Sequence, residues 1–182
     1  MRAALPAALL LLAACGGAAG SSATDSSATE TTPEAPLPRQ PCPLAEDLEL
    51  AVPIAPEHAL AAAPGGCMLV DERAEARFVA LSALAADAVG SELVRDDPAR
   101  FFEASGLLGA DARRTGTAEL RLLGRAVPAQ RWAASPEGLG PRALLTAARR
   151  IDAHWLLVMI VTAPGDGGED LQRLTEALTT TP

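Results

Sequence analysis

Side chains suited to catalysis or metal binding are few in this 182-residue chain and widely spaced. Its two histidines, His58 and His154, stand far apart in the sequence, whereas zinc sites draw three or four ligands from short spacings. Glu103 stands where the G-x-S-x-G turn of serine hydrolases has its first glycine, so Ser105 does not match that motif. No phosphate-binding loop or dinucleotide-binding motif is found either. We therefore predict no catalytic residue, no metal site and no cofactor.

The acidic clusters have structural explanations. Asp166-Gly167-Gly168-Glu169-Asp170 lacks the alternating ligands and the distal glutamate of an EF-hand calcium loop. Acids at the start of a helix, where the backbone dipole is positive, explain it more simply. Asp71-Glu72 and Asp96-Asp97 are interpreted as turn and helix-capping residues. We interpret His154 as a structural residue leading into a core strand. We place His58 with Glu57 in a proline-rich loop, with a role as a metal ligand as the minor alternative.

The two tryptophans are candidates for a contact surface or for the core. Trp132 follows Arg131 close to a loop rich in glycine and proline, and an exposed Trp–Arg pair is a plausible anchor for a partner. An ordinary core tryptophan is the alternative. Strand alternation would place Trp155 on one face with Leu157, Met159 and Val161, so we predict that it lies in the core.

The first 15 residues resemble a bacterial lipoprotein signal. Arg2 supplies a positive end, and the apolar stretch that follows, about ten residues long, is too short to cross a bilayer, which takes about 20. Leu12-Ala13-Ala14-Cys15 is similar to the lipobox at every position. The resemblance implies that the Cys15 thiol receives diacylglycerol, that the chain is cut before Cys15, and that the new amino group is acylated, for example with palmitate. An ordinary cleaved signal with an incidental cysteine is the alternative.

Such an anchor would hold the protein on the extracytoplasmic side of a bacterial membrane. Gly16 after the cysteine resembles the pattern that directs Gram-negative lipoproteins to the outer membrane, facing the periplasm or the cell surface. We predict three regions: a signal peptide at 1–14, a lipidated cysteine with a disordered tether rich in Ala, Ser, Thr and Pro at 15–41, and a single globular domain at 42–182. The tether composition cannot bury enough apolar surface to offset the entropy of ordering the chain.

Cysteine usage agrees with export. With Cys15 assigned to lipid, Cys42 and Cys67 remain as an even pair in an oxidising compartment, and we predict that they form a disulfide. Two buried thiols are the alternative. The spacing is not that of a C-x-x-C redox pair.

The chain is acidic, with a formal net charge of −8. Residues 42–103 carry 12 acids and 4 arginines, and residues 104–182 carry 8 acids and 9 arginines, so the negative charge is concentrated in the first half of the domain. Such a surface excludes nucleic acid as a partner.

The apolar pattern predicts a mixture of strands and helices. Alternation or short apolar runs indicate strands at 48–52, 67–71, 119–122, 126–133 and 154–161. Asp97-Pro98 is a helix start, and a closing helix begins after Gly167-Gly168 with Leu171, Leu174 and Leu178 on one face. Residues 75–84 suit a strand or a helix. The segment 141–151 has helical propensity but could also pair as a strand.

The order of these elements resembles the PsbP-like α/β/α sandwich, which is found in extrinsic photosystem proteins, a nuclear-import factor and many bacterial lipoproteins. Three segments carry the resemblance: Leu50-Ala51-Val52-Pro53, Leu122-Leu123-Gly124-Arg125-Ala126, and the run from Trp155 to Pro164 with the helix that follows. Ala55-Pro56-Glu57-His58 lacks the aromatic residue usual in the first loop. The resemblance implies an α+β fold with a mostly antiparallel sheet, a meander in the C-terminal half and flanking helices. The alternative is an α/β fold with 141–151 as a helix.

The resemblance brings no catalytic residues, because members of the family act mostly as accessory or binding proteins. We therefore expect a lipid-anchored, non-enzymatic accessory or binding protein of the bacterial envelope. Its partner would be an envelope protein or a small ligand. An envelope hydrolase with an unrecognised site and a purely structural surface lipoprotein are the alternatives.

Overall fold

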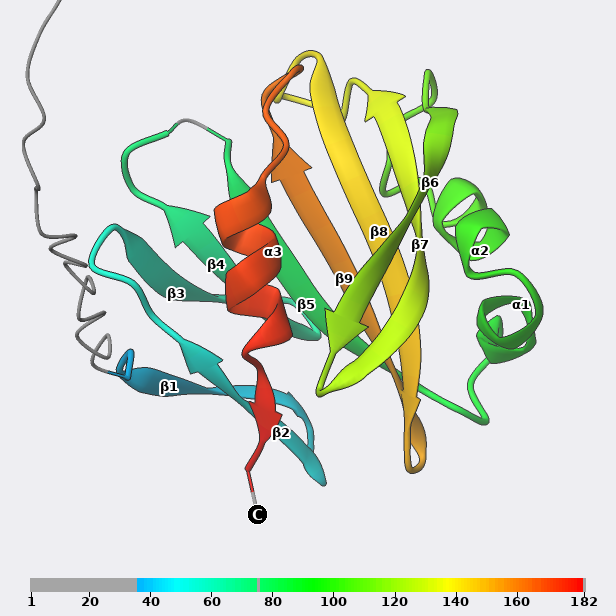
Figure 1. Ribbon diagram of the computed structural model, residues 1–182. Helices are drawn as coiled ribbons and strands as arrows, with labels where there is room; N and C mark the ends of the chain where they lie inside the picture. Colours follow the sequence, from blue (N-terminus) through cyan, green and yellow to red (C-terminus); the bar gives the residue numbers. More distant parts are fainter. Residues whose placement is uncertain (1–35, 75, 182) are drawn as a thin grey trace, which may run out of the picture. The chain divides into compact units, whose positions relative to one another are not determined.

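The computed structural model describes residues 36–74 and 76–181, which form ten strands and three helices (Figure 1). The elements in chain order are β1 (Arg39–Ala45), β2 (Leu48–Pro53), β3 (His58–Ala63), β4 (Gly66–Asp71), β5 (Phe78–Ala85), α1 (Ser91–Asp96), α2 (Pro98–Ala104), β6 (Arg113–Leu122), β7 (Arg125–Ala134), β8 (Arg142–Ile151), β9 (His154–Thr162), α3 (Glu169–Glu176) and β10 (Thr179–Thr180).

The strands form two antiparallel sheets. The larger has seven strands in the order β3-β4-β5-β9-β8-β7-β6, and the smaller has the order β1-β2-β10. After β5 the chain leaves the large sheet through α1 and α2, enters the far edge at β6 and returns by a meander, so that β9 pairs with β5. This topology is the predicted α+β class with a C-terminal meander.

One face of the seven-stranded sheet packs against β1, β2 and α3, and we call it the α3 face. Alternate residues of β9 point to this face and meet the apolar side of α3 in one core of aliphatic side chains and the two cysteines: Cys42, Leu50, Val52, Cys67, Val79, Leu81, Leu145, Leu156, Val158, Ile160, Leu171 and Leu174 are among its members. Leu171 and Leu174 of α3 are buried, as the helical spacing predicts. Leu178 is also buried, but it lies beyond the end of the helix, which stops at Glu176 before β10.

The opposite face is covered by α1 and α2, and we call it the α1–α2 face. Its core contains the alternate residues of β7, β8 and β9 together with Val94 of α1 and Phe102 of α2. Figure 1 shows α3 on one side of the large sheet and the two short helices on the other. Among the described residues, no helix has both the length and the apolar composition that crossing a membrane requires.

The structure settles the segments that had two interpretations. Residues 142–151 form strand β8, so the α/β alternative with a helix there is wrong. Its central residues are buried on both faces, and this packing between β7 and β9 overrides the local helical propensity. Residues 78–85 form strand β5. The helix start at Asp97-Pro98 is confirmed, with the Asp97 carboxylate accepting a hydrogen bond from the Arg100 backbone N–H at 3.0 Å.

The predicted tether boundary at residue 41 is wrong by a few residues. Strand β1 begins at Arg39 and pairs with β2, and the Pro38 carbonyl accepts a hydrogen bond from the Ile54 N–H. The prolines at 38, 41 and 43 do not prevent this pairing, because β1 is an edge strand of its sheet. The predicted signal peptide and Cys15 lie outside the described residues.

Candidate functional site

A tight hairpin places a histidine beside an aspartate at the edge of the large sheet. Ala63 of β3 pairs with Gly66 of β4, so the turn between them is the two residues Pro64 and Gly65. Antiparallel pairing then sets His58 directly opposite Asp71, and both side chains lie on the α3 face. His58 is therefore the buried first residue of β3, and not the loop residue expected from the prolines.

An arginine joins this pair to the segment that begins α3. The Arg77 guanidinium is 13% exposed and donates Nη1–H to Asp71 Oδ2 at 2.6 Å and to Asp170 Oδ2 at 2.8 Å. Its Nη2 donates to Asp170 Oδ1, and its Nε donates to Asp166 Oδ2 at 2.8 Å. One cation thus binds three carboxylates from β4, the β9–α3 loop and the first turn of α3.

The β9–α3 loop is shaped to present these acids. Gly168 has φ of 60°, which favours glycine, and a Cβ there would lie 2.8 Å from Thr162 Cγ2. Its N–H donates to Asp166 Oδ1 at 2.8 Å. The acids that the sequence indicated as simple helix-start residues therefore have a second role, because Asp166 and Asp170 also hold Arg77.

The surroundings favour the ionised form of all three aspartates. Burial opposes ionisation of Asp71, but hydrogen bonds from the Arg73 backbone and from Arg77 outweigh it and lower its pKa. The Gly168 N–H, followed by Arg77, lowers the pKa of Asp166. The Arg77 hydrogen bonds lower the pKa of Asp170, and the same bonds raise the pKa of Arg77. The cluster is therefore fully charged at neutral pH.

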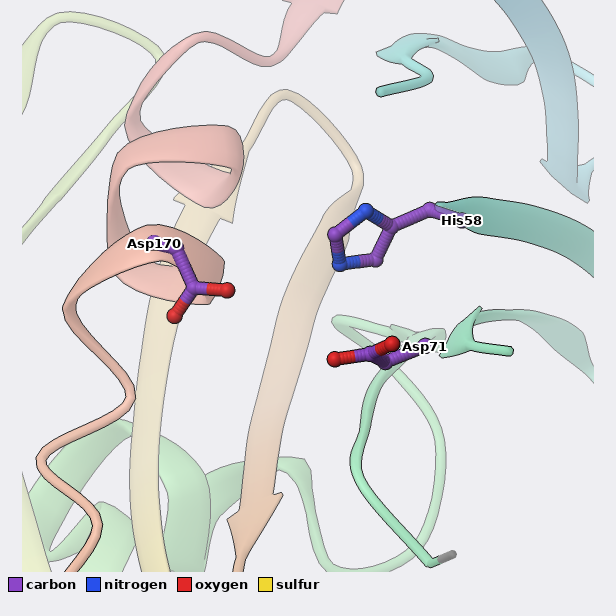
Figure 2. Close-up of side chains that lie close together, drawn as sticks. All are labelled: His58, Asp71 and Asp170. Atoms are coloured by element: carbon purple, nitrogen blue, oxygen red, sulfur yellow. The ribbon is translucent and has the colours of Figure 1, made fainter. Parts of the chain in front are cut away.

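The imidazole of His58 has no hydrogen-bond partner in this cluster. Its side chain is 1% exposed, and neither Nδ1 nor Nε2 bonds to another described residue. Nδ1 lies 4.0 Å from Glu57 Oε1, which is beyond hydrogen-bonding distance. Figure 2 shows the ring directed toward the carboxylates of Asp71 and Asp170. One potential ligand atom from each of these three residues lies within 4.8 Å of the other two.

The predicted disulfide is confirmed. Cys42 of β1 and Cys67 of β4 are bonded, with their Cα atoms 6.0 Å apart and both residues almost completely buried in the α3-face core. The alternative of two free thiols is therefore wrong. The bond fastens the small sheet to the large one.

The expected exposed pair of Arg131 and Trp132 is not found. Trp132 is 1% exposed, because alternation along β7 directs it into the α1–α2 face, and its indole N–H donates to Thr146 Oγ1 at 2.9 Å. The Arg114 guanidinium covers the ring, with Cζ 5.4 Å from its centroid. Arg131 is exposed and points to the other side of the strand. Trp132 is thus a core residue, the alternative that the sequence left open.

The other residues considered for chemistry have structural partners. Ser105 ends α2 and its hydroxyl donates to the Phe102 carbonyl at 2.8 Å. His154 begins β9, with Nε2 3.5 Å from Asp47 Oδ1. Trp155 is half-buried and packs in the α1–α2 core with the residues predicted for its face.

A groove lies where the β8–β9 turn meets the segment between β5 and α1. It consists of two adjoining hollows of about 680 and 690 Å³ that share Ala86, Asp87 and Arg150, and we call it the β8–β9 groove. Arg150 also stacks on Trp155, with Cζ 5.9 Å from the ring centroid. Val89, in the first hollow, is fully exposed. The charged side chains that line the groove are five acids and two arginines: Glu46, Asp47, Asp87, Glu92, Asp96, Arg95 and Arg150.

Sequence reasoning missed the cluster around Arg77. A partial signal was present, since Pro64-Gly65 between two apolar runs predicts a turn. If that turn joins two paired strands directly, residue 58 lies opposite residue 71. No comparable signal connects Arg77 with Asp166 and Asp170, because their contact depends on how α3 packs.

No protein-family model matches this sequence, and no curated protein matches it significantly. Among solved structures, the fold is similar to cyanobacterial PsbP (CyanoP) from Synechocystis sp. PCC 6803, with a TM-score of 0.51, 13% identity, and coverage of 79% of this chain and 92% of that one. A weaker similarity, with a TM-score of 0.45 and 17% identity, links it to LpqN, described as involved in cell envelope biogenesis of Mycobacterium tuberculosis, over 73% of this chain and 83% of that one. The similarity to CyanoP, together with the strand order, shows that the chain has a PsbP-like fold.

Proposed function

We propose that this chain is a lipid-anchored, extracytoplasmic accessory protein of the bacterial envelope that binds a partner at the β8–β9 groove. The role is one of binding and not of catalysis. The anchor is the acylated Cys15, and the partner is an envelope protein that presents a basic segment with an apolar side chain.

The disulfide supports the location. Disulfides persist in oxidising compartments such as the periplasm and the cell surface. Because Cys42 and Cys67 are bonded to each other, the remaining one of the three cysteines is Cys15, which the lipobox resemblance assigns to lipid. The lipobox resemblance and the disulfide are independent observations that favour the same side of the membrane.

The observation that carries the binding role is the β8–β9 groove itself. Val89, a fully exposed aliphatic side chain, lines the same hollow as the half-buried Trp155. Tryptophan is a residue type that anchors interfaces, and the acids around it would select a basic partner by charge. Five acids outnumber two arginines along the groove, and Arg95 is already paired with Asp96. All five acids belong to the acidic first half of the domain, which carries 12 acids in all.

Anchoring is tested by fractionation. Cys15→Ser should move the protein from the membrane fraction to the released fraction, whereas the Cys42→Ser, Cys67→Ser double variant should remain on the membrane. Membrane retention of Cys15→Ser would contradict the lipid anchor.

Partner binding is tested by photocrosslinking in intact cells. A photoreactive amino acid at position 89 should capture one stoichiometric partner. Leu107, also exposed at 52% but located just beyond α2 and outside the groove residues, is the matched control position. An identical pattern from positions 89 and 107, or no product from position 89, would contradict the groove as the binding site.

A further inference from the structure

We propose that His58, Asp71 and Asp170 form a binding site for a divalent metal ion of the zinc class, and that this ion exchanges with the Arg77 guanidinium. The site is independent of the β8–β9 groove and of the proposed partner.

The three residues have the right chemistry and the right spacing. An imidazole with two carboxylates is a nitrogen and oxygen donor set that suits Zn²⁺. The three potential ligand atoms lie within 4.8 Å of one another. Ligand atoms about 2.1 Å from a tetrahedral zinc ion are about 3.4 Å from one another. To bind the ion, the three side chains would therefore have to bring their ligand atoms closer together by little more than an ångström.

The unpartnered imidazole is an independent sign of a ligand. A buried polar group without a partner costs about 1–3 kcal/mol, and native proteins rarely keep one without a reason. His58 has two such nitrogens, on a side chain only 1% exposed, and the ring is directed at the two carboxylates (Figure 2). A metal ion between these groups would use the imidazole nitrogen that faces them.

The charge balance also favours a second cation. Asp71, Asp166 and Asp170 bring three negative charges to one guanidinium, which leaves the cluster with a surplus of negative charge. A divalent ion would offset that surplus.

Arg77 defines where the ion would bind and what it must displace. Its Nη1 lies between Asp71 Oδ2, at 2.6 Å, and Asp170 Oδ2, at 2.8 Å. A metal ion bound by these oxygens would take the place of this Nη1. The guanidinium would keep the bond from its Nε to Asp166, which is not one of the proposed ligands. Metal binding and full Arg77 pairing are therefore alternative states of one cluster.

The experiment is a zinc titration of the full chain in the Cys15→Ser background, where no free thiol competes for metal. The chain has two histidines, so ¹⁵N NMR of the imidazoles reports on His58 and His154 separately. We expect one equivalent of Zn²⁺ to shift the His58 signals and to leave those of His154 unchanged. Calorimetry gives the affinity and the stoichiometry.

Three variants test the ligands and the exchange. His58→Gln should abolish saturable binding, and His154→Gln, which alters the only other histidine, should retain it. Arg77→Gln removes the competing cation and should tighten zinc binding by on the order of tenfold or more. Circular dichroism of each variant confirms that it is folded.

The proposal is overturned if millimolar Zn²⁺ leaves the His58 signals unchanged or if His58→Gln binds with unchanged affinity. It is equally overturned if zinc shifts only His154 or if Arg77→Gln does not tighten binding. None of these outcomes bears on the partner captured at position 89, so the two proposals can fail separately.

Discussion

The two faces of the seven-stranded sheet are covered by different means. All five Phe and Trp residues of the chain lie on the α1–α2 face: Phe78, Phe101, Phe102, Trp132 and Trp155. The α3 face has none, and its core is aliphatic apart from the two cysteines. The chain therefore separates ring side chains from branched ones across a single sheet.

The difference follows from what covers each face. Helices α1 and α2 have six and seven residues, too few to bury much surface, so large rings supply the buried area there. The α3 face is covered by β1, β2 and α3, and specific connections hold them: the Cys42–Cys67 bond and the bonds of Arg77. The α1–α2 face thus relies on large rings, whereas the α3 face combines an aliphatic core with a disulfide and an ion-pair cluster.

The largest loss of stability should follow removal of the Trp132 ring, which lies in the core of the α1–α2 face. Trp132→Ala should lower the free energy of unfolding by about 4 kcal/mol, because a large cavity replaces a fully buried side chain. Trp155→Ala, at a half-buried position, should cost clearly less. Urea denaturation measures both changes in the free energy of unfolding. Equal losses for the two variants would contradict the larger contribution expected of Trp132.

The second largest loss of stability should follow removal of the disulfide that joins the two sheets on the α3 face. Replacing Cys42 and Cys67 by serine should cost about 3.5 kcal/mol, the chain-entropy value for a loop of this length. Urea denaturation of the intact and the double-variant chain gives the difference. Peptide mapping without reductant should show one linked pair in the intact protein, and alkylation of both thiols in native protein would contradict the bond.

The third effect tests the charged link and depends on pH. Arg77→Gln should cost about 2 kcal/mol at pH 7, because it leaves three carboxylates without their cation while two of them stay partly in solvent. The pKa values of the three aspartates are lower in the folded chain than in the unfolded chain, so near pH 4 the unfolded chain binds more protons than the folded chain does. The stabilisation is therefore complete above about pH 4, the ordinary aspartate value, and is lost as pH falls further.

Unfolding curves of the unaltered chain and of Arg77→Gln, measured from pH 7 to pH 2, check this sign. The difference in stability should stay constant down to about pH 5 and shrink below about pH 4. A difference that grows in acid would contradict ionised aspartates as the partners of Arg77.

The smallest effect concerns the surface. Val89→Ser should change the free energy of unfolding by less than about 0.5 kcal/mol, since the side chain is fully exposed. The same change should weaken binding to the partner captured at position 89, measured by titration of that partner. A large loss of stability would show that Val89 is needed for the α1–α2 face and not for binding.

The sequence predicted strands best where one strong pattern was present. Residues 154–161 form a nearly unbroken apolar run, and β9 is indeed the central strand between β5 and β8. Helix α3 was found from its glycines and its leucine spacing. Strand β8 was ambiguous, because its alanines and leucines favour a helix and only the neighbouring strands make it extended.

The candidate cluster was harder to predict than the fold. Strand β3 has the sequence His-Ala-Leu-Ala-Ala-Ala, which lacks the β-branched residues typical of strands, so His58 looked like a loop residue. Arg77 was one of many arginines without a distinguishing pattern. Its three carboxylates lie 6, 89 and 93 positions away, and no local rule connects such distances. The burial of Trp132 was ambiguous, because strand alternation shows which residues share a face but does not show which face is buried at that position.

The position of the disulfide determines how the domain would respond to a pulling force. Strand β1 begins the described chain, so tension from the N-terminal side meets β1 first. Antiparallel strands pulled from one end open one hydrogen bond after another. Here that opening can pass residues 39–41 and stops at Cys42, where the load transfers through sulfur to Cys67 in the large sheet. Under oxidising conditions the force is therefore transmitted to the large sheet at β4. After reduction of the disulfide it would act on β1 alone, which can separate from β2 one hydrogen bond at a time.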